Sequence, residues 1–223
     1  TAGAALLGGI SYLHTYASDL LAINDRIMGS TCDAAFEAHK AGRLKKVTFM
    51  SSSMVFESTD HWPSSEGDER KIPPPLSSYG FQKLAVEYFA RAAWDQYKLP
   101  YTIVRPFNCV GIGERRALGD IDVMSGNVKL AMSHVVPDLV QKIVKGQDPL
   151  HILGDGTQIR HYTYGGDLAR GIVDAMEHAD ARNDDFNLST AASTTVLELA
   201  EARGKKVNTD DRQCSCVRAP GLE

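Results

Sequence analysis

The fold is decided by two stretches of the sequence, LKKVTFMSSS (residues 44–53) and YGFQKLAVEYFARAAWDQYKLPYTIVR (residues 79–105). The apolar centre of the first predicts a buried strand that ends in serines. The second predicts a helix and then a strand over 99–105, because its apolar residues recur at helical spacing and form one stripe toward the core. The stripe consists of Phe81, Leu84, Ala85, Tyr88, Phe89 and Ala92. Parallel strands need a crossover helix, so the pattern indicates an α/β fold with a parallel sheet.

Helices and strands continue to alternate on both sides of this unit. We expect a helix that begins at an N-cap, Ser18, and stops at Gly42. Asp167 is interpreted as the cap of a later helix and not as a catalyst. Two short strands are predicted over 151–153 and 160–163, on either side of a glycine-containing turn.

The composition excludes several classes of protein. The chain has 223 residues, 43% of them apolar, with 24 Lys and Arg against 28 Asp and Glu. The net charge of −4 is too mild for a phosphate-backbone binder, and no apolar run approaches the roughly 20 residues of a membrane span. We therefore expect no nucleic-acid or membrane partner. Four cysteines are no disulfide framework and favour a reducing, cytoplasmic compartment; Cys214-Ser215-Cys216 lacks nearby ligands, so no metal site is expected.

Tyr79 and Lys83 stand four residues apart at the start of the predicted helix. They lie about 40° apart around the helix axis, on the face opposite the apolar stripe. The serines after the first strand reach the carboxyl edge of a parallel sheet, where α/β proteins collect their ligands. A nearby cation lowers the pKa of a phenol from about 10 toward neutral pH. Together these groups predict a proton relay at a carbinol or carbonyl carbon; a solvated polar helix face is the alternative.

Four motifs follow one another along the chain. They are Met50-Ser51-Ser52-Ser53-Met54-Val55-Phe56, Tyr79-x-x-x-Lys83, Arg105-Pro106-Phe107-Asn108-x-x-Gly111, and Gly154-Asp155-Gly156-Thr157-Gln158-x-Arg160-x-Tyr162-x-Tyr164-x-x-Asp167-Leu168. Each alone is common, but together and in this order they resemble the extended short-chain dehydrogenase/reductase family, in its nucleotide-sugar epimerase and dehydratase branch. The resemblance covers about Ala2 to Glu201. It implies a Rossmann-like parallel sheet, NAD as cofactor and a nucleotide-sugar substrate. A homo-oligomer is also expected, because a sheet that lacks its first strands exposes an edge and an apolar face that a partner must cover.

The resemblance assigns roles to the polar residues at the predicted sheet edge. Tyr79 would be the acid/base and would also contact the cofactor, and Lys83 would hold the nicotinamide ribose and lower the pKa of Tyr79. Ser52 would be the catalytic hydroxyl. Ser53 is the alternative catalyst and otherwise a substrate-binding residue, while Ser51 would lie along the cofactor.

Two further residues are implied to bind the substrate. Asn108 would contact the sugar diphosphate, and Arg160 would pair with its phosphates, a task that suits the guanidinium fork. The alternatives are a loop cap for Asn108 and a surface strand residue for Arg160.

The family pattern also divides the chain. Residues 1–110 with 160–190 would be the remainder of the NAD-binding Rossmann domain. Residues 111–159 and 191–203 would form a small substrate-binding part. The polar segment 204–223 has neither helical nor strand periodicity and is predicted to be a disordered tail.

One departure from the family concerns the type of reaction. In sugar-nucleotide 4,6-dehydratases the residues after the catalytic hydroxyl are typically an Asp-Glu pair that removes water, whereas this chain has Ser53 and Met54. Methionine cannot act as an acid or base. The chain is therefore expected to be an epimerase, with a dehydratase or a carbonyl reductase of the same family as alternatives.

A second departure concerns the cofactor. The family opens with a Gly-x-x-Gly-x-x-Gly turn that cradles the dinucleotide, and this sequence has none. Gly111-Ile112-Gly113 follows a strand, but Arg116 stands where a small residue is needed. Ala2–Gly9 resembles the segment after the family's fourth strand, so we expect roughly 90 residues of an N-terminal part to be lacking. A catalytically silent remnant that self-associates or binds a ligand is therefore the alternative to a truncated epimerase.

Overall fold

The computed structural model describes residues 3–7, 13, 15–111, 123–125, 128–130, 134–202 and 207–210. The helices are α2 (Ala17–Lys40), α3 (Ser78–Tyr97), α4 (Val135–Val144), α5 (Gly165–Glu177) and α6 (Val196–Glu201), with short 3₁₀ helices η1 (Ser53–Phe56), η2 (Asp68–Arg70) and η3 (Ala179–Ala181). The strands are β1 (Val47–Met50), β2 (Tyr101–Pro106), β3 (Cys109–Val110), β4 (Val123–Ser125), β5 (Val128–Leu130), β6 (Leu150–Leu153), β7 (Ile159–Arg160), β8 (Thr163–Tyr164), β9 (Asp184–Leu188), β10 (Thr194–Thr195) and β11 (Val207–Asp210).

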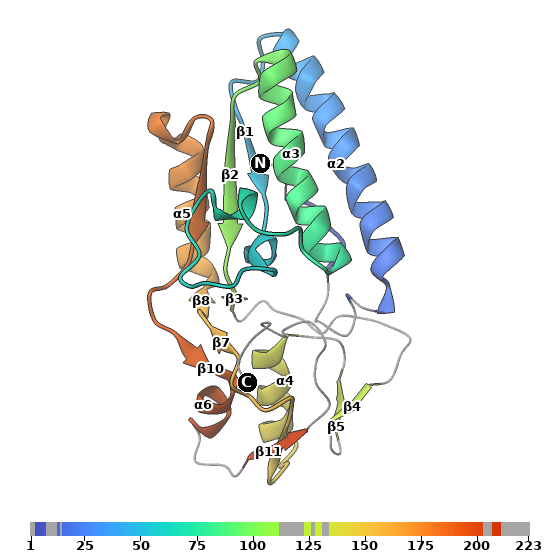
Figure 1. Cartoon of the computed structure of the whole chain (residues 1–223), viewed down its shortest axis with the longest axis vertical. Helices are drawn as coiled ribbons and strands as arrows, with labels where there is room; N and C mark the ends of the chain where they lie inside the picture. The colour runs from blue at the N-terminus through green and yellow to red at the C-terminus, as the bar shows by residue number, and fades with distance from the viewer. Residues whose placement is uncertain are drawn as a thin grey trace.

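A parallel sheet of β1, β2 and β9, in that order, lies at the centre of the larger part of the molecule. Phe49 is paired with Ile103, and Val104 with Phe186. The connections from β1 to β2 and from β2 to β9 run through α3 and α5, as parallel pairing requires. Helices α2 and α3 cover one face of the sheet and α5 covers the other (Figure 1). The predicted α/β fold with a parallel sheet is confirmed.

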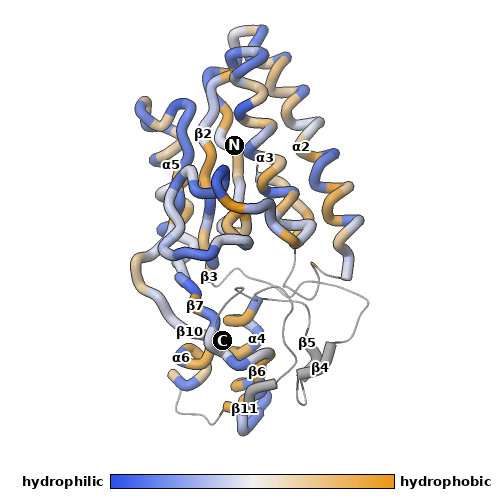
Figure 2. Tube along the Cα trace, viewed as in Figure 1, coloured by the Kyte–Doolittle hydropathy of each residue, from blue (hydrophilic) through white to orange (hydrophobic). Residues whose placement is uncertain are grey.

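The main core lies between the sheet and the two helices α2 and α3. It is formed by Phe49 and Ile103 from the strands, Val86, Ala90 and Ala93 from α3, and Met28, Cys32 and Ala35 from α2, among others. Figure 2 shows hydrophobic residues along β2 and a mixture of hydrophobic and hydrophilic stretches along α2 and α3. Each helix thus buries one side and leaves the other in solvent.

The apolar stripe predicted for α3 is wrong for much of its length. Phe81 is 48% exposed and Tyr88 is 66% exposed. The buried side is instead made of Gly80, Gln82, Lys83, Leu84, Val86, Glu87, Ala90 and Ala93. Small residues let the helix approach the sheet closely, and the buried polar residues break the apolar periodicity. Lys83 therefore lies on the protein-facing side of α3 and not on a solvated face.

Two predicted helix caps are also wrong. Helix α2 has Tyr16 at its N-cap, so that Ser18 lies inside the first turn. Helix α5 has Tyr164 at its N-cap, and Asp167 lies in the first turn, where its charge faces the positive end of the helix dipole and where Arg170 is 3.8 Å away.

A smaller part of the molecule contains α4, α6 and short strands (Figure 1). The strand predicted over 151–153 is confirmed as β6, but β6 pairs in parallel with β11 and not across a turn with the next strand. The other predicted strand is divided into β7 and β8, and β7 pairs with β10. Residues 207–210, which fall in the segment predicted as a tail, form β11.

Several residues considered in the sequence fall outside the described ranges. They are Gly8 and Gly9, Ile112, Gly113 and Arg116, and Cys214 and Cys216. In the described part of the chain, no helix is long and apolar enough to cross a membrane. Across the same residues, no three His, Cys, Asp or Glu side chains gather as metal ligands would.

Candidate active site

The carboxyl end of β1 positions the first component of the candidate site. After Met50 the chain remains extended through Ser52 (φ −160°, ψ 156°) and then turns into η1. The Ser52 hydroxyl accepts a hydrogen bond from the Met54 amide at 3.2 Å and so caps η1. The serine is therefore held at the carboxyl edge of the sheet, with little exposure to solvent.

The start of α3 positions the second component. Ser77 is the N-cap, and its hydroxyl accepts from the Gly80 amide at 3.0 Å. The Glu57 carboxylate in turn accepts from the amide and the hydroxyl of Ser77, at 2.9 and 2.7 Å. A carboxylate at a helix N-terminus is also stabilised by the helix dipole. Glu57 thus ties the chain that follows η1 to the turn that carries Tyr79.

Gly80 allows this turn to pack directly on η1. A Cβ atom on Gly80 would lie 2.7 Å from Pro75 Cβ and 2.8 Å from the Met54 carbonyl oxygen. These atoms belong to a proline ring and to the backbone, and neither can move aside cheaply. Glycine is needed here for space, and it brings the Tyr79 turn against the turn that carries Ser52.

Gly80→Ala is accordingly expected to destabilise the protein by about 1–3 kcal/mol, because the added methyl group forces α3 away from η1. The measurement is urea unfolding followed by circular dichroism. Gly29→Ala in α2 is the matched control, since no atom lies within 4 Å of its Cβ position. That variant is expected to gain up to about 1 kcal/mol from helix propensity. Equal effects at the two glycines would show that α3 and η1 are not in tight contact.

Tyr79 and Ser52 are brought together by these two turns. The Ser52 hydroxyl lies close to the phenol of Tyr79, and this contact lowers the pKa of Tyr79. Burial of the phenol acts in the opposite direction and is the larger effect, so that the pKa of Tyr79 lies above its ordinary value of 10.0. In the ligand-free protein Tyr79 is therefore a protonated phenol, able to donate a proton.

Lys83 lies one helical turn after Tyr79, with its ammonium 5.8 Å from the centroid of the Tyr79 ring. Its Nζ donates a hydrogen bond to the Met50 carbonyl oxygen at 3.1 Å. Burial lowers the pKa of Lys83 from 10.5 to about 8. The expectation that Lys83 brings the pKa of Tyr79 toward neutral is not met in the ligand-free protein, because burial of the phenol outweighs the neighbouring cation.

The other serines are placed differently. Ser51 is buried, and its hydroxyl donates to Glu87 Oε1 at 2.7 Å and lies 3.4 Å from the Lys83 carbonyl oxygen. Its hydroxyl thus points at α3, and its predicted role along the cofactor stays a prediction. Ser53 is the first residue of η1 and is partly buried, next to Ser52.

The two predicted substrate residues lie further along the chain. Asn108 has a positive φ of 37°, a conformation that asparagine tolerates, and its carbonyl oxygen accepts from the Thr163 amide at 3.1 Å. This bond adjoins the pairing of β3 with β8. Arg160 is in β7, opposite Thr194, and its guanidinium donates to the Ile159 carbonyl oxygen at 2.8 Å. The structure unites Ser52, Tyr79 and Lys83, whereas Arg160 belongs to the smaller part of the molecule.

Three residues that shape the site were not identified from the sequence. Glu57 and Gly80 act through contacts between segments far apart in sequence, which no local pattern announces. Glu87 is fully buried on α3. The available signal was its position four residues after Lys83, which puts both charges on one side of the helix.

The chain belongs to the NAD dependent epimerase/dehydratase family, whose model matches residues 2–189. It is 30% identical over 192 residues to UDP-glucose 4-epimerase 3 of Oryza sativa subsp. japonica, with 79% of this chain and 48% of the relative covered. It is 29% identical over 177 residues to UDP-glucose 4-epimerase of Lacticaseibacillus casei, with 76% and 50% covered. The chain thus spans about half the length of these curated relatives.

Solved structures share the fold. A UDP-glucose 4-epimerase from Thermotoga maritima, solved with UDP-glucose, superimposes with a TM-score of 0.77 at 24% identity, over 97% of this chain and 65% of that one. A dTDP-glucose 4,6-dehydratase from Streptomyces venezuelae, solved with NAD, gives a TM-score of 0.71 at 21% identity, over 93% and 59%. Both likenesses show that the chain has the Rossmann-like fold.

Proposed function

We propose that the chain carries the acid/base site of an NAD-dependent epimerase that acts on a nucleotide-diphosphate sugar. The observation that carries this proposal is the placement of Ser52 next to Tyr79, beside the buried ammonium of Lys83, at the carboxyl end of a parallel strand. The named relatives are UDP-glucose 4-epimerases, which favours a UDP-hexose as substrate.

The residues of the chain have distinct tasks in this proposal. Ser52 holds the oxygen of the reacting carbinol next to the phenol, and Tyr79 exchanges a proton with that oxygen. Lys83 supplies a positive charge 5.8 Å from the ring, which stabilises the phenolate whenever Tyr79 gives up its proton. Ser53 and Met54 offer no Asp-Glu pair to remove water, which favours epimerisation over dehydration.

The residues at the sheet edge fit the nicotinamide end of NAD. An ammonium carries three donors, so Lys83 can bind the Met50 carbonyl and ribose hydroxyls together. Gly3 lies beside the same strand end, since a Cβ on it would lie 3.1 Å from Met50 Cγ. NAD bound there would supply reversible hydride transfer at the sugar carbon. The fit is limited to this end, because the sequence holds no Gly-x-x-Gly-x-x-Gly turn for the dinucleotide phosphates.

The remaining assignments complete the proposal. Asn108 and Arg160 would bind the diphosphate of the sugar nucleotide. Residues 1–110 with 160–190 would form the cofactor-binding part, and residues 111–159 with 191–203 the substrate-binding part. The sheet of β1, β2 and β9 lies within the first set, and α4, β6, β7 and β10 lie mostly in the second, which supports this division.

The proposal is tested by calorimetric titration of NAD and of NADH into the purified chain, with the intact mass recorded on the same sample. We expect micromolar binding that Lys83→Met weakens about tenfold or more, and interconversion of UDP-glucose and UDP-galactose. Absence of binding at the mass of 223 residues would overturn the proposal for this chain and leave the catalytically silent alternative. Binding without epimerisation of UDP-, GDP- or dTDP-sugars would favour a reductase or a ligand-binding protein.

The lowered pKa of Lys83 predicts how stability depends on pH. In the unfolded chain Lys83 keeps its proton up to about pH 10.5, whereas in the folded protein it loses the proton near pH 8. Between these values the unfolded state binds more protons, so the free energy of unfolding rises with pH, by about 2 kcal/mol from pH 8 to pH 10. Below pH 8 both states are protonated and the contribution is constant.

The measurement is urea unfolding of the ligand-free chain at several pH values. In Lys83→Met the rise should be smaller by that amount. Tyr79, whose pKa is raised, works against stability only above its ordinary value of 10.0, outside this window. A variant with the same slope as the wild type would show that Lys83 is solvated and fully charged.

We further propose that copies of the chain associate through the exposed apolar side chains of α3. Phe81 and Tyr88 are seven residues, or about two helical turns, apart and project from the side of α3 that does not contact the sheet. Ile23 of the adjacent α2 is also exposed. Light scattering should give a multiple of the 24.3 kDa chain mass, and Phe81→Glu should shift the distribution toward monomer. A monomeric wild type at micromolar concentration would contradict this proposal.

A further inference from the structure

The buried carboxylate of Glu87 links the end of β1, which leads to Ser52, with helix α3, which carries Tyr79 and Lys83. Glu87 is fully buried, one helical turn after Lys83 on α3. Its Oε1 accepts the Ser51 hydroxyl at 2.7 Å and Arg105 Nε at 2.7 Å, and its Oε2 accepts Arg105 Nη2 at 2.8 Å. One side chain of the helix is therefore bonded to the residue that precedes Ser52 and to the end of the neighbouring strand β2.

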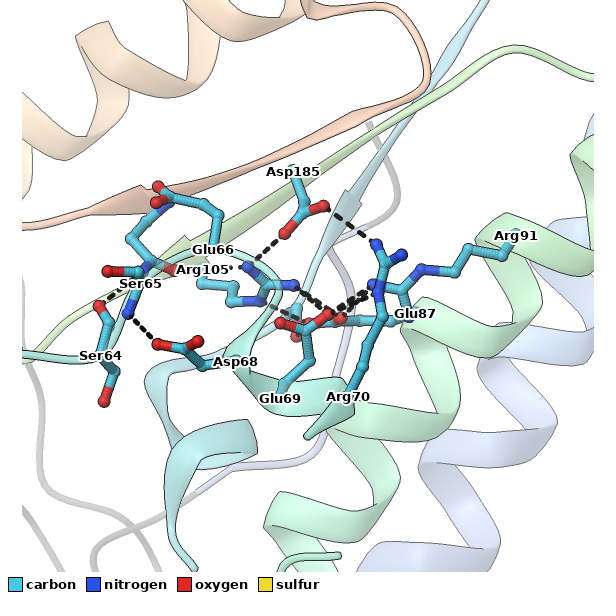
Figure 3. A network of polar contacts seen from close by, with 12 residues as sticks. Ser64, Ser65, Glu66, Asp68, Glu69, Arg70, Glu87, Arg91, Arg105 and Asp185 are labelled. Atoms are coloured by element: carbon cyan, nitrogen blue, oxygen red, sulfur yellow. Dashed lines mark hydrogen bonds and ion pairs between the residues drawn. The ribbon is translucent and has the colours of Figure 1, made fainter. Parts of the chain in front are cut away.

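Arg105 is itself fixed from the opposite side. Its Nη1 is 2.6 Å from Asp185 Oδ2 on β9, and its Nη2 is 3.2 Å from Glu69 Oε1 on η2. The guanidinium thus pairs with Glu87 through two parallel bonds while two other carboxylates hold it in place (Figure 3). Because Arg105 is held in this way, the Glu87 carboxylate that it binds is restricted to one position.

The ion pairs around Glu87 and Arg105 are better suited to holding these side chains in place than to stabilising the fold. Burial of an ion pair costs desolvation energy that roughly cancels its attraction, and in some proteins a buried pair instead specifies one geometry. Three arginines, Arg70, Arg91 and Arg105, balance Glu69, Glu87 and Asp185 (Figure 3). A network balanced in this way exerts little net field on Tyr79 or Lys83, so that its effect on them is geometric.

We propose that Glu87 is a positioning residue of the active site: held by Arg105, its carboxylate fixes the end of β1 against α3 through the Ser51 hydroxyl and so keeps Ser52 next to Tyr79. The proposal rests on the function proposed above in assigning Ser52 and Tyr79 to catalysis. Ser51 provides the direct link, because it neighbours Ser52 and its hydroxyl lies against the turn formed by Lys83 and Glu87.

The test follows the titration of Tyr79 in the ligand-free chain labelled with fluorotyrosine, by ¹⁹F NMR. The resonance of Tyr79 is the one lost in Tyr79→Phe. Because the contact with Ser52 lowers the pKa of Tyr79, loosening that contact in Ser51→Ala or Glu87→Gln should move the titration upward, by about 0.5–1 pH unit. The double variant should show the same shift as each single variant, because Glu87 acts through Ser51.

Arg91→Met is the matched control. Arg91 bonds Glu87 Oε2 at 3.0 Å and Glu69 Oε1 at 2.8 Å, but it has no part in the link from Glu87 to Ser51. Its loss should lower stability without moving the Tyr79 titration. An equal shift in Arg91→Met, no shift in Ser51→Ala, or additive shifts in the double variant would each overturn the proposal. If Glu87→Gln fails to fold, Ser51→Ala decides alone, since it leaves every ion pair in place.

Activity gives an independent readout. Where the wild type epimerises a UDP-sugar, Ser51→Ala and Glu87→Gln should lower kcat about tenfold or more through misplacement of the catalytic hydroxyls. A wild type without activity would overturn the proposed function, whereas the Tyr79 titration would still decide the positioning role.

Discussion

Arg105→Met is expected to lower the free energy of unfolding by about 3–5 kcal/mol. The guanidinium is fully buried and lies within 3.2 Å of carboxylate oxygens of Glu87, Glu69 and Asp185. Methionine fills a similar volume with an apolar chain but leaves these carboxylates short of positive charge. Their desolvation is then uncompensated, and this penalty exceeds what the intact pair contributed. The result would be among the largest effects of a single substitution in this chain.

The matched control is Arg70→Met at the edge of the same network. The Arg70 side chain is 55% exposed and reaches Asp185 at 3.4 Å and Glu69 at 3.1 Å. Since solvent screens such pairs, its loss should cost less than about 1 kcal/mol. Both variants are compared by urea unfolding, with an unchanged m value as evidence that the unfolded states match. Equal losses would show that Arg105 is hydrated in solution.

The parallel sheet could be predicted from the sequence because its evidence is local. Buried strands such as Val47–Met50 are short apolar runs, and the helix between β1 and β2 is long enough to force a crossover. The orientation of that helix could not be predicted in the same way. Lys83 and Glu87 are polar residues on its buried side. Lys83 donates there to the Met50 carbonyl, and Glu87 accepts from Arg105, both of them partners distant in sequence. Hydrophobic periodicity treats such residues as solvent-facing.

The candidate site also combines residues that motif spacing indicates with contacts that only the fold reveals. Ser52, Tyr79 and Lys83 could be assembled from motif spacing, since strand ends and helix starts meet at one edge of a parallel sheet. The direction of the Tyr79 pKa shift could not, because it depends on how deeply the phenol is buried. Arg105 stood in a motif from the beginning, yet its three carboxylate partners come from η2, α3 and β9 and became evident only when the fold was known.

The loop from Glu57 to Ser77 shows why the turns that carry Ser52 and Tyr79 stay in register although twenty or more residues separate these two in the sequence. Two hydrogen bonds join the two ends of this loop. The Glu57 carboxylate accepts from the Ser77 hydroxyl, and the Ser58 hydroxyl donates to the Pro74 carbonyl oxygen. The far end of the loop is held on the sheet by Glu69. A closed and anchored loop has little freedom, so the geometry of the site is set before any ligand binds.

Tyr79→Phe is expected to reduce epimerisation about 10²–10⁴-fold, because the variant keeps the ring and loses the group that exchanges the proton. The fold should remain, since the substitution removes one oxygen and leaves the turn held by Ser77 and Glu57 intact. Binding of NAD should remain within a few-fold of the wild type, because Lys83 and its bond to Met50 do not depend on the phenol. The loss should therefore appear in kcat.

Tyr88→Phe is the matched control, with the same chemical change on the same helix at a side chain that is exposed. It should retain full turnover. The assay follows UDP-galactose formation, and calorimetry measures NAD on the same preparations. Tyr79→Phe with undiminished turnover would refute the role of the phenol. Equal loss in both variants would indicate general damage to the helix, and loss of NAD binding in Tyr79→Phe alone would make the phenol a cofactor ligand, because a group that only moves protons contributes little to the binding of the cofactor.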